Sequence, residues 1–298
     1  MNRLIIDKAC QAKVKNATLI VDDNAKIPLK AIDALYISHK VDMDLRSLVL
    51  IAKADIPVVI VTTRPKEFVH IQKAYHKNAD LKEAQYRALS RRVDIARQII
   101  AKKIANAAAT LKSLHIDFES SIFLKELDAA TDIQELLGIE GNMARRYFGL
   151  YFSIFPKLLA KGSRTKNPPK DPVNALLSYL YTVLYYEIAT RLVYYGFEPS
   201  IGYLHKAFRE HMALASDLLE TIRGDIDLFA AGLLLDAKLL PRHFTRKADA
   251  VYLTDRGRKE LWSHLKEFLE RKETKIKKEI AWIRDIVEKN STSDPTPK

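Results

Sequence analysis

The hydrophobic pattern of this 298-residue chain changes character near residue 78. Before that point, apolar residues come in short runs separated by Asp, Asn, Lys and Pro, which is typical of β-strands. After it, apolar residues recur at helical spacing over long stretches. The chain is therefore predicted to be an α+β protein, with an N-terminal β-rich domain over residues 1–78 and a larger all-helical domain over residues 79–290. The clearest predicted strands are Leu4–Ile6, Thr18–Val21, Ala34–Ser38 and the largely β-branched Val58–Thr62.

Two segments of the predicted helical domain are well marked. Asp171 followed by Pro172 suits a helix start, and Gly196 suits a helix end. The uncharged stretch from Pro172 to Tyr186 is shorter than the roughly 20 residues that a membrane-spanning helix needs, so a buried core helix is expected. The tail 291–298 has nothing to bury and is predicted to be disordered. The other segment, residues 91–111, is an amphipathic helix with basic residues opposite Ile95, Ile99, Ile100 and Ile104.

The composition limits the partners and the compartment. The formal charge of +12 and the isoelectric point near 9.5 favour a polyanion, which can be nucleic acid, an acidic membrane surface or an acidic protein. Cys10 is the only cysteine, so one chain cannot build an internal disulfide or a multi-thiolate metal site. Asp7 and Lys8 interrupt the first apolar run too early for a signal peptide. A cytoplasmic protein without a membrane segment is expected.

Acidic residues and one histidine form a candidate divalent-metal site. Asp217 and Glu220 are three residues apart, which places them on one face of a helix. His205 adds a nitrogen ligand, and Glu140, flanked by Gly138 and Gly141, is expected to contribute from a separate helix start. Mixed carboxylate and imidazole ligation suits Mg²⁺ or Mn²⁺ with open water positions. The alternative is that the carboxylates lie on a solvated helix face and His205 is a buried core residue. His211 is interpreted as a surface residue.

Basic residues surround these acidic candidates in the sequence. If the helices converge, the cations would hold phosphates around an acidic centre, which is the arrangement a nuclease needs. The alternative is that each simply solvates its own helix. The loop 161–172 is polar, basic and proline-rich and is predicted to be exposed. The candidate nucleic-acid-binding residues are Arg145, Arg146, Arg164, Lys166, Lys206 and Arg209, with Lys161 and Lys170 beside them.

Residues 239–262 contain a second nucleic-acid signal. A basic loop, a short strand from Val251 to Thr254 and a helix opened by Asp255 or Gly257 resemble the wing of a winged-helix module. No convincing recognition helix precedes them, because residues 225–240 are acidic and apolar. The resemblance is therefore interpreted as local, and the alternative is an ordinary β-turn insert within the helical domain. A non-catalytic winged-helix-like DNA-binding regulator built around this segment is the competing hypothesis for the function. The tyrosines between Tyr179 and Tyr195 are interpreted as core residues with polar tips.

Four motifs in order resemble the CRISPR adaptation integrase family, the catalytic proteins that insert new spacers into CRISPR arrays. The likeness spans most of residues 87–270. The motifs are E-G-N-x-A-R-R-Y-F at Glu140–Phe148, D-P-V-N-A-L-L-S-Y-x-Y at Asp171–Tyr181, G-F-E-P-x-I-G-Y-L-H at Gly196–His205, and L-A-x-D-L-x-E-x-x-R at Leu214–Arg223.

The resemblance implies a fold, a site and a reaction. It implies an N-terminal β-domain, a helical catalytic domain, and metal ligation by Glu140, His205 and Glu220, with Asp217 matching the first acid of the last motif. The implied reaction is metal-dependent transesterification on double-stranded DNA, in which a prespacer 3′-hydroxyl attacks a phosphodiester of the CRISPR repeat. The implied assembly is a homodimer with a small ferredoxin-like companion adaptation protein that bridges two dimers. An RNA-processing nuclease and a metal phosphohydrolase remain alternatives.

Overall fold

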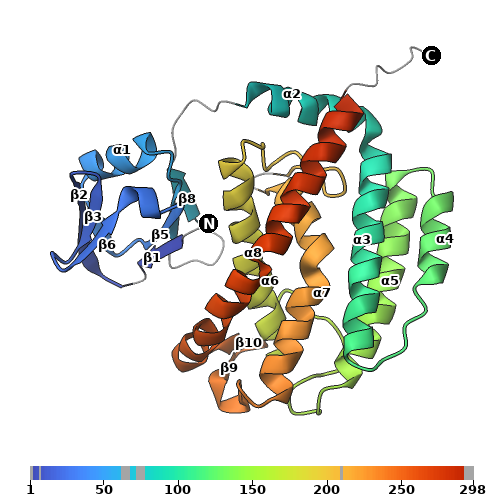
Figure 1. Ribbon diagram of the computed structural model, residues 1–298. Helices are drawn as coiled ribbons and strands as arrows, with labels where there is room; N and C mark the ends of the chain where they lie inside the picture. The colour runs from blue at the N-terminus through green and yellow to red at the C-terminus, as the bar shows by residue number, and fades with distance from the viewer. Residues whose placement is uncertain (1–2, 7, 62–67, 72–77, 209–210, 292–298) are drawn as a thin grey trace. The chain divides into compact units, whose positions relative to one another are not determined.

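The computed structural model describes residues 3–6, 8–61, 68–71, 78–208 and 211–291. The chain forms two compact units (Figure 1). One consists of residues 1–79 with 194–196, and the other of residues 80–193 with 197–298. The N-terminal strands and the larger helical portion confirm the predicted α+β class. Except for Ser291, the predicted disordered tail lies outside the described residues.

The first unit contains two four-stranded sheets. One sheet has the order β1-β5-β7-β8, with β1, β5 and β7 parallel and β8 antiparallel to β7. The other has the order β4-β3-β2-β6, with β2 parallel to β6 and the remaining pairs antiparallel. The strands are β1 Arg3–Ile6, β2 Cys10–Lys15, β3 Thr18–Val21, β4 Ala25–Pro28, β5 Ala34–Ser38, β6 Val41–Met43, β7 Val58–Val61 and β8 Phe68–Ile71, with a 3₁₀ turn η1 at Leu29–Ala31.

Burial in the core of the first unit decides which of its strands can be recognised from the sequence. Leu35 and Val58 are fully buried on neighbouring parallel strands, and such strands have nearly continuous apolar sequences. Strand β2 instead alternates exposed residues with the buried Ala12, so it contains no apolar run to find. Helix α1, Leu45–Lys53, begins after Asp44, whose Oδ1 accepts a hydrogen bond from the backbone nitrogen of Ser47 at 2.7 Å.

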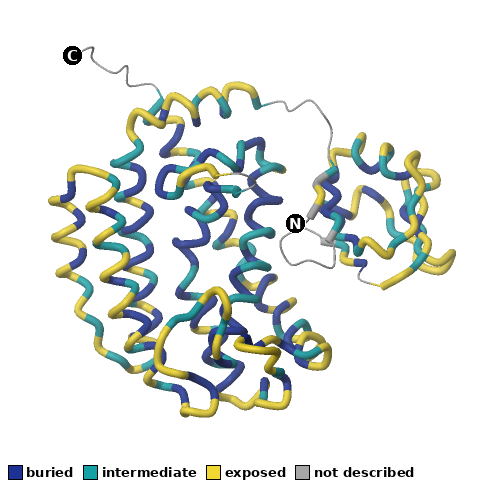
Figure 2. The backbone as a smooth tube through the Cα atoms, turned by 180° about the vertical axis from the view of Figure 1, so that it is seen from behind, coloured by how far each residue is buried: buried dark blue, intermediate teal, exposed yellow. Residues whose placement is uncertain are grey.

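The second unit is mainly helical and is organised around α3, which contacts both α5 and α7 (Figure 1). Helices α6 and α7 are buried along most of their length, whereas α4 keeps most of its surface in water (Figure 2). Among the described residues, no helix is long and apolar enough to cross a membrane. The helices are α2 Ala79–Arg87, α3 Arg92–Ser113, α4 Ser121–Ala129, α5 Ile133–Ser153, α6 Pro172–Tyr194, α7 Ala213–Leu235 and α8 Asp255–Ser291, with 3₁₀ turns η2 Ala88–Arg91 and η3 Pro241–His243.

The predicted limits of α6 are confirmed. Oδ1 of the buried Asp171 accepts a hydrogen bond from the backbone nitrogen of Asn174 at 2.7 Å, so this residue caps the helix that Pro172 opens. Gly196, two residues beyond the last helical residue, has φ +88°, a conformation that glycine adopts without a steric penalty.

The wing-like segment is a local β-hairpin. Strands β9, Phe244–Lys247, and β10, Ala250–Leu253, pair antiparallel, and α8 then begins at Asp255 as predicted. The segment before the hairpin is mostly the buried C-terminal half of α7, so it offers no exposed recognition helix. The hairpin is therefore an insert within the helical unit.

The loop 161–172 is more firmly held than its composition predicts. The Arg164 guanidinium donates to Oδ1 of Asn174 at 2.8 Å and to Oγ of Ser178 at 3.1 Å on α6. The backbone nitrogen of Val251 donates to the carbonyl oxygen of Pro169 at 2.8 Å. These contacts tie the loop to α6 and to β10, while most of its residues, among them Lys161, Lys166 and Lys170, are exposed as predicted.

Candidate active site

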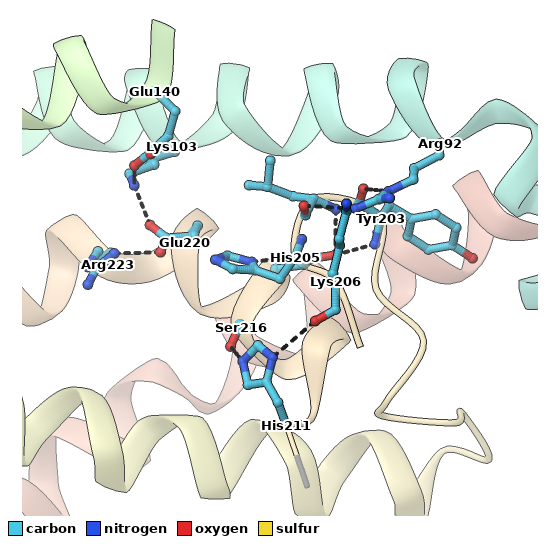
Figure 3. Close-up of polar contacts among 12 residues, drawn as sticks. Arg92, Lys103, Glu140, Tyr203, His205, Lys206, His211, Ser216, Glu220 and Arg223 are labelled. Atoms are coloured by element: carbon cyan, nitrogen blue, oxygen red, sulfur yellow. Dashed lines mark hydrogen bonds and ion pairs between the residues drawn. The ribbon is translucent and has the colours of Figure 1, made fainter. Parts of the chain in front are cut away.

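A lysine lies between two carboxylates at the centre of the candidate site. The Lys103 ammonium on α3 contacts Oε1 of Glu140 on α5 and lies 2.6 Å from Oε2 of Glu220 on α7. Figure 3 shows the three side chains meeting from three helices. The side chains of Lys103 and Glu220 are only 9% and 10% exposed, so their charges are largely withdrawn from water and depend on each other.

A second cation contacts Glu220. Nη1 of Arg223, one turn further along α7, donates to Oε1 of Glu220. Burial by itself raises the pKa of the Glu220 carboxyl, but Arg223 and Lys103 outweigh burial and hold that pKa well below its ordinary value. Glu220 is therefore ionised at neutral pH.

A buried tyrosine–aspartate network lies behind Arg223. The Arg223 guanidinium lies 4.3 Å from the centroid of the Tyr181 ring. The Tyr181 hydroxyl donates to Oδ1 of Asp227, and the Tyr147 hydroxyl donates to Oδ2 at 2.7 Å. Burial raises the pKa of Asp227 although Tyr181 and Arg223 act in the opposite direction. The network holds the Arg223 side chain in place beside Glu220.

Asp217 organises the turn that carries His205. Its fully buried carboxylate accepts hydrogen bonds from the backbone nitrogens of Tyr203 at 2.6 Å, Leu204 at 3.1 Å and His205 at 2.9 Å. Oδ1 also lies 2.8 Å from Nδ1 of His205. Because a carboxylate only accepts, Nδ1 carries a hydrogen, and in the uncharged form of the ring this leaves the lone pair on Nε2. The ring points from this turn toward Glu220 (Figure 3).

The same turn is held from α3. Nε of Arg92 donates to the carbonyl oxygen of Tyr203 at 2.6 Å, and Nη2 donates to that of Leu204 at 3.2 Å. Gly202 permits the close packing, because a Cβ there would lie 2.7 Å from Cβ of Ala213 and 2.9 Å from Oδ2 of Asp217. The imidazole is therefore fixed from both α3 and α7.

A family model described as "CRISPR associated protein Cas1" matches residues 4–267. The chain belongs to the Cas1 family. A CRISPR-associated endonuclease Cas1 of Thermodesulfovibrio yellowstonii is 29% identical over 283 residues, covering 89% of each chain. Among solved structures, a Cas1 protein from Thermotoga maritima has a TM-score of 0.84 at 21% identity, over 100% of this chain and 99% of that one. A casposase bound to integration product has a TM-score of 0.82 at 20% identity, over 99% and 92%. These two likenesses show the fold.

The acidic residues predicted for the site of this Cas1 chain lie in two separate places. Glu140 and Glu220 meet at Lys103, whereas Asp217 faces the turn of His205. The expectation that Glu140 lies at a helix start was wrong. Helix α5 begins at Ile133, because Asp132 caps it by accepting from the backbone nitrogen of Gln134 at 2.7 Å. Glu140 thus projects from within α5.

The donor side chains at the candidate site are of the types that suit a hard divalent cation. Two carboxylates contact the same Lys103 nitrogen, and His205 presents Nε2 on the side of Glu220. Such a set matches the oxygen and imidazole preferences of Mg²⁺ and Mn²⁺. In the part of the chain that the structure describes, no group of three or more His, Cys, Asp and Glu side chains is arranged to hold a metal ion. The Lys103 ammonium occupies the space between the two carboxylates.

The candidate nucleic-acid-binding residues differ in how exposed they are. Arg164 is partly buried and bonded to α6, which indicates a structural role. Lys166 is exposed, and the partial burial of its ammonium, followed by the positive charge of Arg223, lowers the pKa of that ammonium. Arg209 lies outside the described residues. The other candidates, Arg145, Arg146 and Lys206, are exposed.

His211 is not the surface residue that the sequence suggested. Its Nε2 lies 2.8 Å from Oγ of Ser216, and its ring stacks on Tyr185 with the centroids 6.1 Å apart. The His205 ring lies edge-on to it with the centroids 6.0 Å apart. His211 is therefore partly buried beside the site.

Sequence reasoning missed two cations, Lys103 and Arg223. Arg223 ends the last motif, three residues after Glu220, so helical spacing alone could have paired them. Lys103 follows Ile99 and Ile100 at helical spacing, which gives a local signal that it faces the core. The prediction placed all basic residues of this helix opposite the isoleucines. It therefore overlooked that Lys103 lies on the same side as Ile99 and Ile100.

Proposed function

We propose that this protein is a metal-dependent DNA endonuclease and integrase that inserts new spacers into a CRISPR array. The observation that carries the proposal is the meeting of Glu140, Glu220 and the His205 turn, which come from α5, α7 and the α6–α7 connection of a Cas1 chain. A casposase that shares the fold is bound to integration product, which supports the integrase reading.

Glu140, His205 and Glu220 would hold a Mg²⁺ or Mn²⁺ ion, and such an ion would polarise a phosphoryl oxygen and stabilise the charge that develops on it. Asp217 keeps the Nδ1 hydrogen of His205 in place, so that Nε2 acts as a ligand rather than a base. Arg223 keeps Glu220 ionised. The exposed Lys166 and the exposed Arg145 and Arg146 of α5 would contact phosphates.

The proposed reaction is transesterification. A 3′-hydroxyl of a double-stranded prespacer attacks a phosphodiester of the CRISPR repeat, and the bond to the repeat's own 3′-oxygen breaks as the new one forms. With water as the nucleophile, the same site cuts DNA. The proposed assembly is a homodimer that works with a small ferredoxin-like companion bridging two dimers, as the family resemblance implies.

A strand-transfer assay tests the proposal. The purified protein and its companion are given a short duplex with free 3′-hydroxyls and a supercoiled repeat plasmid, with Mg²⁺, Mn²⁺ or a chelator. Wild type should join the strands only with metal. Glu220→Ala and His205→Ala should each lower the joining rate at least roughly 100-fold while retaining DNA binding.

Glu267→Ala is the matched control, because this glutamate on α8 is 67% exposed and pairs only with the surface Arg271 among the contacts described. It should join at the wild-type rate. Joining that persists in a chelator or in Glu220→Ala would refute the proposed metal site. DNA binding without joining or cutting in any metal would favour a non-catalytic DNA-binding protein.

A further inference from the structure

Lys103 lies where the proposed metal ion would bind, between Glu140 and Glu220. A divalent cation held by Glu140 and Glu220 would draw on the same two carboxylates that the Lys103 ammonium contacts. Two cations cannot share this space, since like charges in a poorly hydrated site repel strongly. Lys103 and the metal therefore compete for the same two ligands.

The contacts of Glu220 identify the competing oxygen. Oε1 accepts from Arg223, whereas Oε2 is buried and accepts no well-formed hydrogen bond among the residues that the structure describes. The close neighbour of Oε2 is the Lys103 ammonium, 2.6 Å away, as an ion pair. Arg223 can thus stay in place while Oε2 exchanges one cation for another.

A small cavity adjoins Lys103. This cavity beside the site is lined by Lys103 together with Met143, Tyr147, Arg223 and Asp227. The side chain of a lysine is long and flexible, so its head group can shift by rotating about several bonds. The neighbouring Lys102 is differently placed, because its ammonium pairs with Glu279 at 2.6 Å and lies 3.9 Å from the Trp282 ring centroid on α8.

We propose that Lys103 is a built-in counter-cation that holds the place of the metal and sets how tightly the metal binds. In the metal-free protein it neutralises Glu140 and Glu220, which keeps two partly buried carboxylates from repelling each other. Metal binding must break both contacts, so part of the intrinsic metal affinity is offset by their loss. This inference rests on the proposed metal site and adds the control of its occupancy.

The test is direct Mn²⁺ binding, followed by isothermal titration calorimetry and by the electron paramagnetic resonance signal of free Mn²⁺. Lys103→Met and Lys103→Gln should bind Mn²⁺ at least roughly tenfold more tightly than wild type, which is the scale of one lost close charge contact. Lys102→Met should bind as wild type does. Without metal, the Lys103 variants should unfold at lower temperature, and Mn²⁺ should raise their unfolding temperature more than that of wild type.

Two results separate this inference from the proposed function. If wild type binds Mn²⁺ and Glu220→Ala does not, but both folded Lys103 variants bind with unchanged or weaker affinity, the metal site stands and the role of Lys103 is refuted. If wild type and the Lys103 variants bind no Mn²⁺, both proposals fail. Circular dichroism of each variant checks its fold, and the Gln variant retains a polar head group should the Met variant fail to fold.

Discussion

A buried carboxylate can serve a site without touching the reacting atoms, and Asp217 is such a residue. Both of its oxygens are used to hold the 203–205 backbone and the Nδ1 of His205. Glu220, three residues later on the same helix, instead faces Lys103 and Glu140. The sequence spacing grouped the two acids as one catalytic set, whereas the structure places Asp217 against the His205 turn and Glu220 against Lys103 and Arg223. We therefore propose a positioning role for Asp217 and keep metal ligation as a proposal for Glu220.

Asp217→Asn should therefore damage both stability and metal binding. The amide has one acceptor oxygen in place of two, and its NH₂ group would face backbone N–H donors. We expect the free energy of unfolding to fall by about 3 kcal/mol, and Mn²⁺ affinity and joining to fall roughly 10- to 100-fold. Urea unfolding and Mn²⁺ titration measure these effects. Asp236→Asn, at an aspartate that is 61% exposed just after α7, is the control and should change neither. Wild-type stability and affinity in Asp217→Asn would contradict the positioning role.

At the scale of elements, the contact between α3 and α7 sets the site, because it brings Lys103 to Glu220. The contact is close at Gly224, whose backbone nitrogen donates to Oδ1 of Asn106 at 2.6 Å. A Cβ at Gly224 would lie 2.3 Å from Oγ1 of Thr110 and 2.8 Å from the carbonyl oxygen of Asn106. The helical pattern predicted both helices but not this crossing, since a glycine inside a helix carries no sign of what packs against it.

Gly224→Ala should force the two helices apart. We expect the free energy of unfolding to fall by about 1–3 kcal/mol, and joining to fall with it because Lys103, Glu220 and Arg223 lie close to the contact. Gly232→Ala on the same helix has open space at the added carbon and should stabilise the protein by up to about 1 kcal/mol. Thermal unfolding of the two variants compares them. Equal stability of the two would show that the helices do not pack closely at Gly224.

At the scale of the whole molecule, the formal charge of +12 governs binding to polyanions separately from the chemistry. Neutralising phosphates releases counterions, so the logarithm of the binding constant falls linearly with the logarithm of salt concentration, with a slope of about −0.9 per phosphate contacted. The acidic site should contribute little to this salt dependence, because Lys103 and Arg223 already pair with its carboxylates.

The salt dependence of DNA binding should therefore be the same for wild type and Glu220→Ala. Lys166→Ala should weaken binding to all duplex sequences and reduce the slope by about 1. Lys112→Ala, at an exposed lysine near the C-terminal end of α3, provides the comparison and should leave the slope unchanged. Fluorescence anisotropy at several salt concentrations measures the slopes. An unchanged slope in Lys166→Ala would mean that this lysine does not contact phosphate.

The sequence alone predicted the class of the fold, the limits of α6 and the acid pair of the candidate site, although not the cations that contact these acids. These follow from local chemistry: strand runs, helical periodicity, an N-cap and an acid pair on one helix face. Only the tertiary structure decided that Asp217 turns to His205, that Glu220 meets Glu140, and that Lys103 lies between them rather than in water. The physical reason is that periodicity fixes directions within one helix, whereas packing between helices decides which side chains share a buried space and must neutralise one another.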